Sequence, residues 1–98
     1  MSGAVCVHNV SNTALTWSFA VHNGDFVSDP MDIAGQAEVC QDLTQFDELN
    51  DDDVLVHTVC NAEDSTECGH VFNVYAENHT TWITNCEHNQ YGVACGII

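Results

Sequence analysis

Bulky side chains alternate with small or polar ones along several short segments of the chain. Leu15, Trp17 and Phe19 alternate with such residues between positions 15 and 21. Since successive side chains of a β-strand point to opposite faces, this pattern predicts a strand with one face in a core. Other β-prone segments are expected at residues 4–10, 26–28, 31–33, 38–42, 54–60, 70–76, 80–86 and 93–98.

Turn-forming residues separate these segments. Asn23 and Gly24 form the Asn-Gly pair of tight hairpins, in which both central residues need a positive φ. Pro30 interrupts the strand pattern, the polar residues 61–69 predict a loop, and only residues 43–49 show a helical tendency, of one or two turns. We expect seven or eight of these nine segments to be strands. Short strands at this spacing predict an all-β fold, a small disulfide-stabilised antiparallel β-sandwich or jelly roll.

The length of 98 residues fits one domain, so we expect a single β-sandwich over residues 1–98. Residues 1–10 are expected to form an N-terminal strand or arm that makes contacts between subunits. No apolar run approaches the length of a membrane span, so membrane insertion is not expected. No signal peptide is visible at the start of the sequence, which leaves the export route open.

The charge is strongly one-sided. The chain has 15 acidic residues, no Lys, no Arg and six His, which gives a formal net charge of −15 at pH 7. A domain of this size would ordinarily hold roughly a dozen Lys and Arg. Nucleic acid is excluded as a direct partner, because nothing neutralises a phosphate backbone. The composition also removes every cleavage site for trypsin-like proteases.

Six cysteines in a short chain predict a disulfide framework in an oxidising compartment, outside the cell or on a cell or spore surface. They are Cys6, Cys40, Cys60, Cys68, Cys86 and Cys95. Six cysteines allow 15 pairings. Proximity favours Cys60 with Cys68 and Cys86 with Cys95, which leaves Cys6 for Cys40. A zinc site built from two Cys-x-His pairs is the alternative, but its spacing matches no familiar zinc module.

An acidic segment at residues 42–53 is a candidate site for Ca²⁺, the one cofactor considered. Hard cations bind clustered carboxylates, and the proposed ligands are Asp47, Asp51, Asp52 and Asp53. The EF-hand spacing is absent. The alternative is a hydrated loop that keeps the surface soluble.

Two aromatic residues and two sequons are further candidates. Trp82 and Tyr91 are candidate binding residues, whereas Trp17 shares a strand face with bulky neighbours and is expected in the core. Asn9 and Asn78 each begin an N-glycosylation motif. Nucleophile elbows, phosphate-binding loops and metalloprotease motifs are missing, so we do not expect an enzyme.

Three functions fit these features. The first is an extracellular structural protein that assembles with itself into a fibre, coat or matrix, through β-strand contacts and disulfides. The second is a secreted monomeric binding module, a lectin-like or toxin-like sandwich that depends on Ca²⁺. The third is an acid-tuned switch in which each His pairs with a carboxylate.

Overall fold

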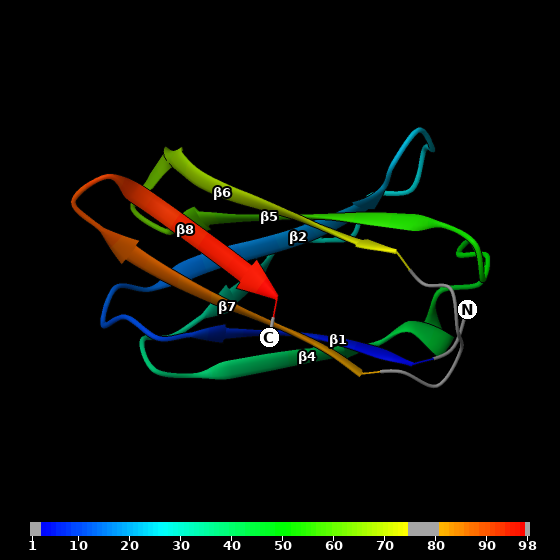
Figure 1. Ribbon diagram of the computed structural model, residues 1–98, viewed down its shortest axis with the longest axis horizontal. Coiled ribbons are helices and arrows are strands. Elements are labelled where there is room, and N and C mark those ends of the chain that lie inside the picture. Colours follow the sequence, from blue (N-terminus) through cyan, green and yellow to red (C-terminus); the bar gives the residue numbers. More distant parts are fainter. Residues whose placement is uncertain (1–2, 75–80, 98) are drawn as a thin grey trace.

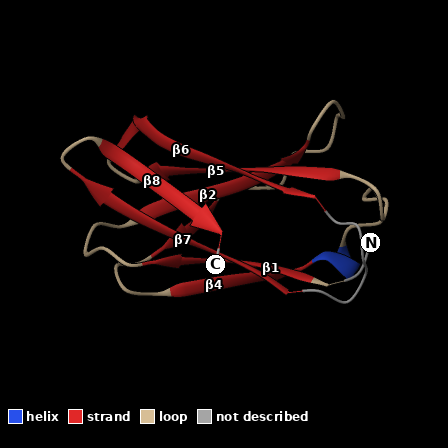
Figure 2. Cartoon of the chain, in the orientation of Figure 1, coloured by secondary structure: helices blue, strands red, loops and turns tan. Residues whose placement is uncertain are grey.

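The fold is seen in a computed structural model of the chain, which describes residues 3–74 and 81–97. Strands make up most of this length, together with one short 3-10 helix (Figure 2). The elements are β1 (Ala4–Asn9), β2 (Leu15–Val21), β3 (Met31–Ile33), β4 (Glu38–Asp42), η1 (Leu43–Gln45), β5 (Val54–Asn61), β6 (Asp64–Val74), β7 (Thr81–Asn89) and β8 (Gly92–Ile97). The all-β prediction is confirmed. Within the described ranges, no helix is long and apolar enough to cross a membrane.

The strands form two four-stranded sheets that pack as a sandwich. Sheet A has the order β4-β1-β7-β8, and sheet B has the order β3-β2-β5-β6. Figure 1 shows them as two layers, with β2, β5 and β6 in one layer and β1 and β4 in the other. Neighbouring strands are antiparallel except β1 and β7, which are parallel. The sandwich is therefore mixed at this one pair.

The core lies between the sheets, where the alternation in the sequence places it. Leu15, Trp17 and Phe19 of β2 are at most 1 % exposed, and Leu55 of β5 is fully buried. The indole N–H of Trp17 donates a hydrogen bond to His57 Nδ1 over 3.0 Å. A buried polar group is costly unless it is hydrogen-bonded, so this contact lets two polar rings share an apolar core. Trp17 is a core residue, as expected.

β1 is an inner strand of sheet A and not a free N-terminal arm. It pairs with β4 on one side and with β7 on the other. Val5 and Val7 point from it into the core. Because both of its sides already take part in sheet pairing, β1 offers no open edge to another molecule. The predicted N-terminal strand is observed as β1. Its use in contacts between subunits stays a prediction, and in the described residues such contacts would not be made by strand pairing along β1.

β6 begins earlier than the sequence predicts. Residues 61–69 are polar and predict a loop, but a tight turn joins β5 to β6, and Asn61 lies opposite Asp64. The prediction of a loop was wrong because β6 is an edge strand, with a neighbour on one side only. Its first residues are solvent-exposed, so their polarity reflects exposure and not a missing strand.

Each of the three disulfides joins two residues that lie directly opposite each other on neighbouring strands. The pairs are Cys6–Cys40 between β1 and β4, Cys60–Cys68 between β5 and β6, and Cys86–Cys95 between β7 and β8. The favoured pairing is confirmed, and no cysteine is left as a thiol for zinc. Every bridge fixes the register within one sheet, and none connects the two sheets.

β6 and β8 approach each other closely at Gly69. A Cβ atom on Gly69 would lie 2.7 Å from the backbone oxygen of Val93 and 3.3 Å from Cys95 Sγ. A backbone oxygen cannot rotate away, so Gly69→Ala must push the two strands apart. We expect this variant to lose about 1–3 kcal/mol of unfolding free energy in urea. Gly96→Ala is the control, because a Cβ there meets no atom within 4 Å; equal losses in both variants would contradict the steric explanation.

Candidate functional site

A hollow of about 440 Å³ lies at one end of the sandwich. It forms between the turn after β2 and the loop before β5, which are cyan and green at the right of Figure 1. Its size lies within the range of small-ligand pockets. Apolar, amide and acidic residues share its wall: Val21, His22, Asn23, Gly24, Asp25, Phe26, Glu48, Asn50 and Asp53.

Three phenylalanines fix the aromatic part of this wall. Phe26 meets Phe46 edge to face with ring centroids 5.3 Å apart, and Phe46 meets Phe19 in the same way at 5.6 Å. Phe19 is 1 % exposed, so it anchors the cluster in the core. Phe26 is half-buried and lines the hollow. The aromatic surface of the hollow is therefore fixed by ring contacts that lead from Phe26 through Phe46 to the buried Phe19.

The turn after β2 differs from the expected hairpin. Asn23 has a φ of 62°, but the φ of Gly24 is not positive. Only one of the two central residues therefore adopts the left-handed conformation. A Cβ at Gly24 would lie 2.8 Å from Val21 Cγ1, so a larger residue there would require the Val21 side chain to move. The turn closes with a hydrogen bond from the Val21 N–H to the Phe26 carbonyl over 3.1 Å. This closure holds Asp25 at the wall of the hollow.

The opposite wall is a loop anchored by one apolar residue. Leu49 is 3 % exposed, and its N–H donates to the Phe46 carbonyl over 3.2 Å. Asp53 Oδ2 accepts a hydrogen bond from the Asn50 N–H over 2.8 Å, and the Asp53 N–H donates to the Asn50 carbonyl over 3.1 Å. These contacts give the loop a defined shape. Glu48 is exposed beside them.

The hollow carries three carboxyl groups, from Asp25, Glu48 and Asp53, and the chain has no Lys or Arg to pair with them. Among the described residues, no three metal-ligating side chains converge closely enough to hold one ion. Asp47, Asp51 and Asp52 do not line the hollow. The predicted calcium site stays a prediction, and it has no assembled ligand group in the described part of the chain.

Two carboxyl groups elsewhere have lowered pKa values. The backbone N–H and then the hydroxyl of Thr44 donate to Asp42 and lower its pKa; the hydroxyl and then the N–H of Thr66 do the same for Asp64. These hydrogen bonds favour the ionised carboxylate. They therefore stabilise the fold above the ordinary carboxyl pKa, and this contribution is lost as the pH falls through the lowered value.

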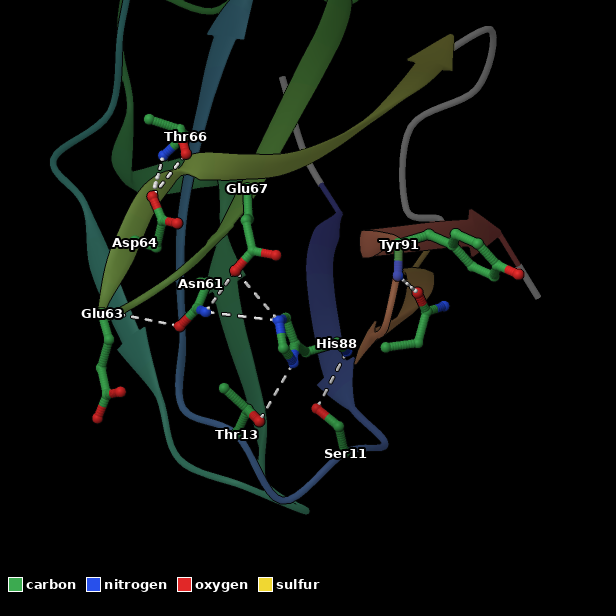
Figure 3. A network of polar contacts seen from close by, with 10 residues as sticks. Ser11, Thr13, Asn61, Glu63, Asp64, Thr66, Glu67, His88 and Tyr91 are labelled. Carbon is green, nitrogen blue, oxygen red and sulfur yellow. Dashed lines mark hydrogen bonds and ion pairs between the residues drawn. The ribbon is translucent and has the colours of Figure 1, made fainter.

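A polar network closes the opposite end of the sandwich (Figure 3). His88 Nε2 of β7 lies 3.2 Å from Glu67 Oε1 of β6, and Asn61 Nδ2 donates to the same oxygen over 2.9 Å. The His88 N–H donates to Ser11 Oγ over 3.3 Å, and His88 Nδ1 lies 3.5 Å from Thr13 Oγ1. Because β6 belongs to sheet B and β7 to sheet A, the network links the two sheets.

The sequence of hydroxyl, imidazole and carboxylate in this network resembles the order of groups in a catalytic triad. The distance between Thr13 Oγ1 and His88 Nδ1 is 3.5 Å, which exceeds the roughly 2.6–3.2 Å expected between a nucleophile and its base. Asn61, which is 8 % exposed, also binds Glu67. We therefore interpret the network as a structural link between the sheets.

The histidines do not share one role. Only some contacts match the acid-switch hypothesis, in which each His pairs with a carboxylate. His88 does so with Glu67, but the described partners of others are different: the His57 ring accepts from Trp17, His70 Nδ1 lies 3.1 Å from Thr58 Oγ1, and the His22 ring contacts Phe72.

The two aromatic residues proposed for binding lie far apart. Trp82 is half-buried and packs against the core cluster near the start of β7. Tyr91 is 89 % exposed in the turn after β7. Since a strand rises about 3.4 Å per residue, more than about 20 Å separates them. They do not form one site with each other or with the hollow.

The two glycosylation motifs have different outcomes. Asn9 is fully buried, and its Nδ2 donates to the carbonyls of Thr13, Ile33 and Ala34. A glycan on this nitrogen is incompatible with the folded chain, so the prediction for Asn9 fails. Asn78 lies outside the described residues.

The sequence reasoning missed the hollow. The Asn-Gly turn and the acidic segment are separate features of the sequence, and no local signal joins residues 22–26 to residues 48–53. Their proximity depends on the pairing of β2 with β5. No protein-family model matches the chain, and neither a curated protein nor a solved structure gives a match.

Proposed function

We propose that the chain is a non-enzymatic extracellular binding domain whose hollow receives a cationic organic group, such as the guanidinium or ammonium of a partner. The observation that carries the proposal is the combination of three carboxyl groups with an aromatic wall in one cavity. A cation gains from the carboxylates and from the negative face of an aromatic ring. The function is thus the binding module of the sequence analysis, with a different site.

The distribution of the acidic groups favours an organic cation over a bare metal ion. The carboxylates surround a hollow of about 440 Å³ and do not converge on one point. A metal ion needs several oxygens at about 2.0–2.6 Å, whereas a guanidinium spreads its charge over several donors. The net charge of −15 also raises the local concentration of cations and their rate of association.

The proposed location outside the cell, or on a cell or spore surface, rests on the cysteines. Three disulfides in a chain of 98 residues are consistent with an oxidising compartment. Disulfides of this density are typical of small secreted domains whose cores are limited.

The proposal is tested with argininamide, a small molecule with a guanidinium. We expect its titration at physiological salt to shift the backbone amide NMR signals of residues 22–26 and 48–53. The double variant Asp25→Asn, Glu48→Gln should weaken this binding at least about fivefold, because two charges facing the cation are removed. Both side chains are exposed, so the fold should survive the substitutions.

The control removes the same charge at a distance. Asp32→Asn, Glu87→Gln changes two exposed carboxylates that do not line the hollow. This variant should bind argininamide with nearly unchanged affinity. If both double variants weaken binding equally, or if the NMR shifts scatter over all acidic residues, the attraction is a general effect of charge and the hollow is not a site.

Assembly of the chain with itself is the second candidate, and the observation that favours it is the exposure of Val27 and Phe72, at 66 % and 53 %. Contacts between copies would be non-covalent, because all six cysteines are paired within the chain. They would also not add a strand along β1, because both edges of this inner strand are already paired. Filaments in negative-stain images would favour this function over the first.

A further inference from the structure

An apolar row crosses the outer face of sheet B. Val27 forms a β-bridge with Ala20, Ala20 lies opposite Val56, and Val56 lies opposite Phe72. Directly opposed residues point to the same face of a sheet. Phe19 of β2 and His57 of β5, which are next to Ala20 and Val56 in sequence, are buried in the core. Since successive strand residues point to opposite faces, the row lies on the outer face of the sheet. With strands about 4.8 Å apart, the row is about 14 Å long.

The row is exposed mainly at its ends and carries no charge. Val27 is 66 % exposed and Phe72 is 53 % exposed, whereas Ala20 and Val56 between them are half-buried. None of the 15 acidic residues interrupts it. The neighbouring row on the same face, Ser18, Thr58 and His70, also lacks a carboxylate. An uncharged apolar row on a highly charged domain is a candidate for an interaction site.

His22 connects the row to the hollow. Its ring meets the ring of Phe72 edge to face, with centroids 5.6 Å apart. His22 also lines the hollow, beside Asp25. The apolar row and the acidic hollow are therefore adjacent parts of one surface, with His22 between them.

We propose that this surface binds a segment of another protein that places an Arg or Lys side chain in the hollow and an apolar side chain against Phe72. The inference rests on the proposed function and adds the class of partner. Charge complementarity favours a basic partner, because the carboxylates of the hollow and the net charge of −15 both attract positive charge. A second copy of these 98 residues has no Lys or Arg to place in the hollow and would be repelled.

The test uses a short synthetic peptide that alternates Arg with Leu. Two matched peptides replace Arg with the neutral citrulline or replace Leu with Ala. Affinities are measured by calorimetry at physiological salt. We expect the Arg-Leu peptide to bind more tightly than either matched peptide, because each of them can use only one part of the surface.

Phe72→Ala should weaken binding of the Arg-Leu peptide at least about fivefold, as truncation of a central aromatic contact does. Phe72→Leu should retain most of the affinity, since it keeps an apolar side chain at the row. The matched control is Tyr91→Ala, which removes an aromatic ring that is 89 % exposed elsewhere. Tyr91→Ala should leave the affinity unchanged, and far-UV circular dichroism should show the same fold in all three variants.

The outcomes separate this inference from the proposed function. If Asp25→Asn, Glu48→Gln weakens binding and Phe72→Ala does not, the hollow takes the cation and the docking inference is wrong. If the citrulline peptide binds as tightly as the Arg-Leu peptide, the proposed function is wrong as well. If the protein alone forms dimers and the Phe72→Ala variant is monomeric, a second copy occupies the row and the inference is overturned.

Discussion

Reduction of the three disulfides is expected to unfold this domain at 25 °C. In the chain-entropy description, a bridge that spans 34 residues contributes about 4 kcal/mol, and bridges that span eight or nine residues contribute about 2.5 kcal/mol each. Together these contributions are as large as the whole stability of a typical small domain, about 5–15 kcal/mol. Circular dichroism with and without a reductant measures the change directly.

The bridges are also expected to differ in how much each contributes to the free energy of unfolding. Cys6→Ala, Cys40→Ala should cost about 4 kcal/mol, because it opens the longest loop and removes a cysteine that is 4 % exposed. Cys60→Ala, Cys68→Ala should cost about 2.5 kcal/mol, because its loop is short and both residues are half-buried. Urea unfolding of the two variants gives the comparison. A reduced protein that stays folded would show that the bridges are dispensable and would remove the main support for an extracellular location.

Asn9→Ala is expected to cost about 3–5 kcal/mol, more than most single substitutions. The side chain is fully buried, and its Nδ2 donates to three carbonyls at 2.8–3.3 Å. Its Oδ1 accepts from the N–H and the hydroxyl of Ser11 at 3.0 and 2.7 Å. Removal leaves the buried Ile33 carbonyl and the partly buried groups around it without their partner, and each group that stays buried costs about 1–3 kcal/mol.

Asn9→Asp isolates the role of the donor. It keeps an acceptor toward Ser11 but turns a carboxylate oxygen toward three carbonyl oxygens, so we expect a loss at least as large as that of Asn9→Ala. Asn12→Ala is the control, because Asn12 is exposed and its loss should cost less than about 0.5 kcal/mol. Unfolding can be followed by the fluorescence of the buried Trp17. Similar losses at Asn9 and Asn12 would show that the buried network adds little.

Much of the fold could be predicted because its signals are local. The alternation of Leu15, Trp17 and Phe19 places β2 against the core, since strand side chains alternate between faces. Cys60 and Cys68 are close in sequence, so a short hairpin brings them together. The boundary of β6 was less predictable, because an exposed edge strand has the polar composition of a loop.

The candidate sites were less predictable because they depend on contacts between distant residues. Asn9 has the local pattern of a glycosylation site, yet its nitrogen is used inside the loop that follows β1. Asp25 and Glu48 carry no motif and become neighbours only in the folded chain. The row from Val27 to Phe72 requires the register of β2, β5 and β6, which no sequence motif encodes.

The sequence by itself determined the all-β class and the excess of negative charge, because alternation and composition can be read directly from the chain. It favoured the disulfide pairing through the short spacing of four of the cysteines, and the structure established that pairing. The tertiary structure alone decided that β1 is an inner strand, that an acidic hollow lies beside Phe26, and that an apolar row reaches it through His22. The physical reason is that strand order and register set which distant side chains share a face, and these are chosen by the packing of the whole core.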